Sequence, residues 1–416
     1  MLTSTDLRRR YTRSDARGSF PRVTGAPDIA CNRMALYWRP IVDLTDTPRA
    51  PMRLAMIRPV SEWIADPRSG RVSWFSRIGV AGLRSQVVRH AGLTEYDVRE
   101  PADLPTHLRT PAWQRLVDAL DEFDDLDPHT RALVVFQLAQ LTFCYYAKRL
   151  TGVVAPIGEP GHDHYAYQVA RVHVRIPGHA AEAMPVLEEL TANRHDPELA
   201  MLAAAQGVGQ AVRSLKDVGL GLRFEQAAQP ALARASGWHG HLALSRYHRA
   251  VALLRINERR PADMRAEMRS AWHHHEEVVA AAPDDEVARM VVVENRRILV
   301  ESEVKSVFRV DEEETHHRLR AWAEELTRLD PYCVEALLVA GDGYAVAGDW
   351  ATAAHWYTRA GELGTTAGAN GWYRAAQCFD HLGDRDSAAN AMGRCLELDT
   401  TAVEPRKYLD NFGQAL

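Results

Sequence analysis

The sequence predicts a mostly α-helical protein built from packed helical hairpins. Apolar residues recur at helical spacing through most of residues 106–285. The last third repeats its own pattern, from Gly348 to Gly383, at an offset of 35 residues. Hydrophobic residues make up 46% of the 416 residues and charged residues 25%. That balance is typical of globular chains and excludes a disordered or fibrous protein.

Residues 1–30 are predicted to form a flexible, arginine-rich arm. Six arginines fall within the first 22 residues, and glycines and prolines follow them. No apolar stretch comes after these arginines, so a secretory signal is not expected. The formal net charge of −5 gives the whole chain no basic field, so we expect no nucleic-acid partner.

Residues 31–105 are predicted to form a small N-terminal segment of mixed structure. The short apolar runs 34–38 and 54–57 are bounded by prolines. Periodicity alone does not decide between short β strands and irregular packed segments in such runs. A helix is predicted over residues 75–90.

Residues 106–285 are predicted to form a central helical region. A proline at the first helical position, preceded by a capping residue, marks the start of a helix. Three such signals are present: Thr110-Pro111, Asp127-Pro128 and Asp196-Pro197. Between the second and third signals, residues 153–180 are predicted to break the helical pattern. Prolines and glycines interrupt 153–161, and the alternation at 172–176 is compatible with a short strand.

Residues 286–416 are predicted to contain repeated helical hairpins. When residues 339–360 are aligned with residues 374–395, small residues match small ones and aromatic residues match aromatic ones. Gly341 aligns with Ala376, and Tyr344 aligns with Phe379. The turn pair Gly-Asp recurs at 348 and at 383. Small residues let two antiparallel helices approach closely, and the aromatic residue fills the space between them.

This pattern resembles the tetratricopeptide repeat, whose usual period is 34 residues. The resemblance covers residues 310–410 well and 240–310 weakly, and it does not extend before residue 195. It implies helix pairs stacked into a superhelix, with a concave face where a ligand binds. The family's clamp for a peptide carboxylate is not reproduced, because Leu338 and Asp342 stand in the corresponding region of one unit.

The first functional hypothesis is a non-catalytic scaffold or adaptor that binds a protein or peptide. Only four of the 50 basic residues are lysines, a bias typical of GC-rich bacterial genomes, so a bacterial cytoplasmic pathway is expected. Arginines in the groove would pair with carboxylates of the partner; a salt-bridged outer face is the alternative explanation for them. The candidate groove residues are Arg246, Arg249, Asn295, Arg296, Arg297, Tyr373, Arg374 and Gln377.

A helical enzyme of unfamiliar type is the second hypothesis, with a site between the N-terminal half and the repeats. His162 and His164 flank Asp163 in the predicted loop, and such a group suits a divalent metal in a peptide-modifying enzyme. A solvated loop is the simpler interpretation of the same residues. No catalytic residue can be assigned, since signatures such as GxSxG and the Walker motif are absent.

A ligand-sensing regulator is the third hypothesis, although no helix-turn-helix module precedes the repeats. We expect no cofactor and no membrane segment, and a homo-oligomer remains an option. The five cysteines contain no CxxC pair, which favours a reducing cytoplasm. His273, His274 and His275 are predicted to lie on a helix in a structural, surface role. Gly207 and Gly209 are predicted to serve close helix packing.

Overall fold

In the computed structural model the described part of the chain is mostly α-helical and contains no β strand. The structure describes residues 99–108, 111–140, 143–152, 160–193, 195–283, 334–362 and 368–414, with 292, 295–296, 298–303, 321–322 and 324–325. The arm 1–30, nearly all of segment 31–105 and the helix predicted over 75–90 lie outside these residues. The mostly α-helical fold class is confirmed.

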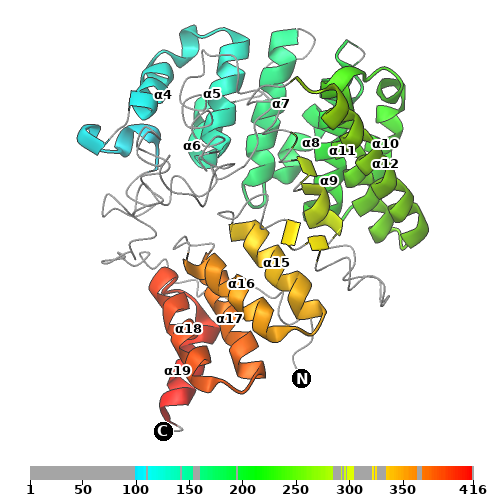
Figure 1. Ribbon diagram of the computed structural model, residues 1–416. Coiled ribbons are helices and arrows are strands. Elements are labelled where there is room, and N and C mark those ends of the chain that lie inside the picture. The colour runs from blue at the N-terminus through cyan, green and yellow to red at the C-terminus, as the bar shows by residue number, and fades with distance from the viewer. Residues whose placement is uncertain are drawn as a thin grey trace. The chain divides into compact units, whose positions relative to one another are not determined.

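The chain divides into two compact units, each described here by itself (Figure 1). Residues 100–299 belong to the central unit, and residues 300–416 to the C-terminal unit. The helices of the central unit are α4 (Pro111–Asp121), α5 (Pro128–Gln140), α6 (Cys144–Thr151), α7 (Pro160–Arg175), α8 (Ala180–Thr191), α9 (Pro197–Gln210), α10 (Val218–Leu232), α11 (Gly237–Asn257) and α12 (Pro261–Ala281). Short turns accompany them: η3 (Pro101–Asp103), η4 (Thr106–Leu108), η5 (Phe123–Asp125) and the π-helical η6 (Ala211–Leu215).

The predicted helix starts are confirmed, because α4, α5 and α9 each begin at the expected proline. Asp127 Oδ1 accepts hydrogen bonds from the backbone N–H groups of His129 (3.0 Å) and Thr130 (3.1 Å). Asp196 Oδ1 accepts one from the N–H of Leu199 (2.9 Å). These bonds satisfy amide groups that have no partner within the first helical turn.

The predicted break over 153–180 is wrong for residues 160–175, since α7 runs through Pro160–Arg175. Residues 176–179 do interrupt the helices, and α8 begins at Ala180, where helical patterning was expected to resume. The strand expected at 172–176 is therefore helical as far as Arg175. Pro160 stands at the first helical position, where its missing N–H is not needed. Ala166, Val169 and Ala170 are buried at helical spacing. This buried stripe explains the helix better than a five-residue alternation does.

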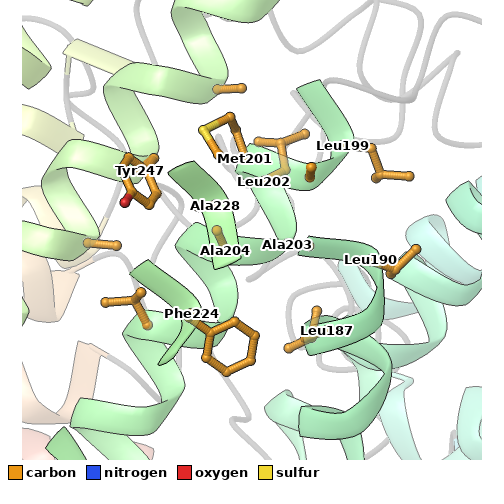
Figure 2. Packing of buried hydrophobic residues seen from close by; sticks show 14 of the residues in the cluster. Leu187, Leu190, Leu199, Met201, Leu202, Ala203, Ala204, Phe224, Ala228 and Tyr247 are labelled. Carbon is orange, nitrogen blue, oxygen red and sulfur yellow. The ribbon is translucent and has the colours of Figure 1, made fainter. Parts of the chain in front are cut away.

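The core of the central unit lies among α7, α8, α9, α10 and α11. Leu187, Leu190, Leu199 and Phe224 are buried there, and Figure 2 shows them gathered between the helices. Gly207 explains how closely α9 and α10 approach, because a Cβ atom on it would lie 2.4 Å from the Phe224 ring. The predicted packing role is thus confirmed for Gly207. The same prediction is wrong for Gly209, because a Cβ atom there would meet nothing within 4 Å.

Two helical hairpins and a final helix make up the fully described part of the C-terminal unit. Its helices are α15 (Val334–Val346), α16 (Trp350–Glu362), α17 (Gly368–His381), α18 (Arg385–Leu398) and α19 (Val403–Gln414). They follow one another as neighbours in Figure 1. The repeat of 35 residues is therefore a repeat of structure.

The Gly-Asp turns have the same structure and the same role in both hairpins. Gly348 and Gly383 have φ angles of 78° and 83°, a backbone conformation that favours glycine. The aspartate after each glycine accepts a hydrogen bond from the backbone N–H three residues later in the chain. Asp349 Oδ1 lies 3.1 Å from the nitrogen of Thr352, and Asp384 Oδ1 lies 3.1 Å from that of Ser387. Each pair thus ends one helix and starts the next. None of the described helices combines the length and apolar content needed to cross a membrane.

Candidate functional site

A buried ion pair joins the first helices of the two C-terminal hairpins. Asp342 of α15 accepts hydrogen bonds from the guanidinium of Arg374 on α17 and from the hydroxyl of Tyr357 on α16 (2.7 Å). The side chains of Asp342 and Arg374 are about one-tenth exposed, and Tyr357 is fully buried. Burial alone would lower the pKa of Arg374, but the charge of Asp342 raises it overall. Burial and the same carboxylate raise the pKa of Tyr357.

The other predicted groove residues of this unit lie on the same helix as Arg374. Tyr373 is 8% exposed and Gln377 is half-buried. Burial raises the pKa of Tyr373. The Gln377 Oε1 atom is buried and has no hydrogen-bond partner among the described residues. Tyr373 and Gln377 are four residues apart, so they share a face of α17.

A second polar cluster lies in the core of the central unit and includes the predicted groove residue Asn295. Asn295 Nδ2 lies 2.9 Å from Ser245 Oγ and 3.2 Å from His275 Nδ1. Ser245 donates its hydroxyl hydrogen to the carbonyl oxygen of Ala271 (2.8 Å). Ser245, His275 and Asn295 are all fully buried. The expectations of Asn295 in an open groove and of His275 on the surface are therefore wrong, because both side chains lie in the core.

The remaining predicted groove arginines lie in different surroundings. Arg246 and Arg249 are half-buried on α11. The Arg296 guanidinium carbon lies 5.4 Å from the centre of the Trp272 ring, a cation–π contact. The side chain of Arg297 lies outside the described residues. The eight predicted groove residues therefore belong to two units, five in the central one and three in the C-terminal one.

A group of histidines lies between α11 and α12, and its members were not predicted from the sequence to come together. His241 Nδ1 and His274 Nδ1 are 3.0 Å apart, and the His248 ring stacks on His274 with centroids 5.4 Å apart. Burial, then the neighbouring histidines, lower the pKa of His274 to about 4. His248 Nδ1 lies 2.7 Å from Glu267 Oε2. The signal available in the sequence is the seven-residue spacing of His241 and His248, which puts them on one helix face.

An ion-pair network continues from Glu267 along the same hairpin. Arg255 lies 3.9 Å from Glu267, 2.7 Å from Glu258, and in direct contact with Glu225 of α10. Burial alone would lower the pKa of Arg255, but the hydrogen bonds to Glu225 and Glu258 raise it overall. A guanidinium that is charged at all accessible pH values holds α10, α11 and α12 together here.

The two predicted metal ligands stand on α7 rather than in a loop. His164 Nε2 lies 3.3 Å from Asp196 Oδ2, next to the start of α9, and His162 is half-buried. Two residues apart on a helix, these side chains point in directions roughly 200° apart. Among the described residues no group of three or more His, Cys, Asp or Glu side chains could hold a metal ion.

Comparison with protein-family models and with curated proteins gives no match. Two solved structures show a likeness at low identity. One is a human IFIT1 dimer with PPP-AAAA, at 9% identity and a TM-score of 0.31, covering 86% of this chain and 85% of that one. The other is an APC/C hetero-tetramer of Cut9 and Hcn1, at 10% identity and a TM-score of 0.21, covering 92% of each chain. Neither likeness is close enough to inform the function.

Proposed function

We propose that this chain is a non-catalytic helical-repeat scaffold that binds a protein or peptide partner. The observation that carries this proposal is the direct link between Asp342 and Arg374. It brings α15 and α17, the first helices of successive hairpins, side by side, so that their residues form one continuous face. Stacked helices of this kind provide extended surfaces for a ligand.

The chemistry of this face favours recognition by shape and hydrogen bonding. The charge of Arg374 is already neutralised by Asp342, so this arginine has little left to offer a partner's carboxylate. Gln377 is half-buried on α17, and the N–H donors of its amide group suit a backbone carbonyl oxygen of a peptide. The scarcity of lysine supports a bacterial source, and we place the scaffold in the cytoplasm of such a cell.

Selection of peptides on the immobilised full-length protein tests the proposal. We expect a peptide to be enriched, and Gln377→Ala to weaken its binding at least ~10-fold in a fluorescence-anisotropy titration, since a buried hydrogen bond is lost. Binding should change little when salt is raised, because the face carries no net charge from its central pair. Arg394→Ala, an exposed change on α18, is the matched control.

Two results of the peptide selection would overturn the proposal. If no peptide is enriched, or if the enriched peptide binds wild type and Gln377→Ala equally well, this face is not the binding site. The circular dichroism of each variant shows whether the helices remain folded, so that loss of binding is not confused with unfolding.

A further inference from the structure

The hydrogen bonds around Asn295 fix the position of the proton on His275. The Asn295 amide group has two hydrogens, and its two neighbours are Ser245 Oγ and His275 Nδ1. Ser245 has used its own hydrogen on the carbonyl of Ala271, so its oxygen can only accept from Asn295. The second amide hydrogen then points at His275 Nδ1, which must accept it. His275 is therefore neutral, with its proton on Nε2.

A second proton on His275 would break this arrangement. It would have to bind at Nδ1, where it would face the N–H of Asn295, donor against donor. The resulting cation would also be fully buried, away from water. The burial, together with the charge of Arg296, lowers the pKa of His275 from its ordinary value of 6.5 to about 4.

We propose that His275 and Asn295 form a proton-sensitive latch. It holds the short segment of helical residues 295–296 and 298–299 on α11 and α12 while His275 is neutral, and it releases this segment when His275 is protonated. Three helical elements meet at these side chains: Ser245 comes from α11, His275 from α12 and Asn295 from the segment. His275 Nε2 and Asn295 Oδ1 are buried with no hydrogen-bond partner among the described residues. Such groups weaken the closed state and leave it easier to open.

Among the residues that the structure describes, the groups that face His275 come from three elements. Arg296 comes from the segment, and its charge opposes protonation. On α12 the Trp272 ring meets the His275 ring edge-on, with centroids 5.8 Å apart. On α11 the facing group is the neutral hydroxyl of Ser245. The histidines His241, His248 and His274 lie on the same hairpin, and the experiment must separate their effect from that of His275.

The sign of the pH dependence follows from the two states. The open state takes up a proton near pH 6.5, and the closed state only near pH 4. The latch is therefore fully closed above about pH 6.5 and opens progressively as the pH falls toward 4. At pH 4.5 this difference in proton affinity favours opening by about 50- to 100-fold over neutral pH.

Hydrogen exchange of the backbone amides of Ile298 and Leu299, measured by mass spectrometry on the full chain, tests the latch. After correction for the intrinsic exchange rates, we expect protection of these amides to fall by about 50- to 100-fold between pH 7 and pH 4.5. His275→Gln keeps a hydrogen-bond acceptor but has no proton to gain, so its protection should stay constant. Unchanged protection in wild type overturns the latch.

Two further variants keep the proposal falsifiable. His274→Gln leaves the latch intact, so it should show the wild-type fall in protection. If it abolishes the fall while His275→Gln does not, the neighbouring histidines are the sensor and the latch is wrong. Should His275→Gln fail to fold, Asn295→Asp replaces it. Its carboxylate would bind protonated His275, so protection should be retained in acid; a wild-type fall would contradict the latch.

Discussion

Replacing Asp342 by alanine is expected to lower the free energy of unfolding of the C-terminal hairpins by about 3–5 kcal/mol. Arg374 is 8% exposed and would keep its charge without the carboxylate that now neutralises it. The hydroxyl of Tyr357 would lose its acceptor at the same time. The two compact units of the chain need not unfold in one transition, so a single unfolding curve would mix them. Amide hydrogen exchange in α15 and α17 therefore measures the effect, because it reports on these hairpins alone.

The chain offers a matched control for this prediction. Arg394 and Glu397 form an ion pair on α18 at 2.9 Å, with both side chains more than half exposed. Glu397→Ala should change stability by no more than about 0.5 kcal/mol, since water screens an exposed pair. The double variant Asp342→Leu with Arg374→Met should recover most of the loss. Equal effects of Asp342→Ala and Glu397→Ala would show that the buried pair is not structurally important.

Gly371→Ala is expected to destabilise the same hairpins by about 2–4 kcal/mol, although alanine is the better helix former. A Cβ atom on Gly371 would lie 2.6 Å from the carbonyl oxygen of Tyr357 and 2.7 Å from the backbone nitrogen of Gly361. Both contacts are with the backbone of α16, which cannot swing aside as a side chain can. The two helices would have to separate. Thermal unfolding, with hydrogen exchange in α16 and α17, measures the loss.

Gly393→Ala is the comparison for that substitution. Gly393 lies within α18, and a Cβ atom on it would meet nothing within 4 Å. Only the helix propensity then changes, so this variant should be neutral or more stable by up to about 1 kcal/mol. A loss of stability in Gly393→Ala equal to that in Gly371→Ala would contradict the packing explanation.

The elements that local chemistry determines were predictable from the sequence. Pro111, Pro128 and Pro197 mark helix starts because a proline at the first position costs no hydrogen bond. The turns at Gly348 and Gly383 were recognisable because a left-handed backbone favours glycine. Helix α7 was missed because its polar residues, three histidines among them, obscured a buried stripe of small apolar residues.

The candidate sites were less predictable, since they depend on contacts between distant residues. Arg374 reads as a free cation in the sequence, and only its contact with Asp342, which lies 32 positions earlier, neutralises it. Asn295 lies among arginines and glutamates and suggests an exposed face, yet Ser245 and His275 hold it in the core. Ser245 lies 50 positions before Asn295, and the residues next to Asn295 in the sequence do not indicate such a distant partner.

The carboxylate of Asp342 also has a consequence for the chemistry of Cys378. This thiol is fully buried, and burial, then the charge of Asp342, raise its pKa to about 12. The thiolate, which is the form that alkylating and oxidising reagents attack, is thus nearly absent at neutral pH. Cys378 should therefore resist such reagents for as long as α15, α16 and α17 stay packed. The rate at which a thiol reagent labels Cys378 would then report how often these hairpins open.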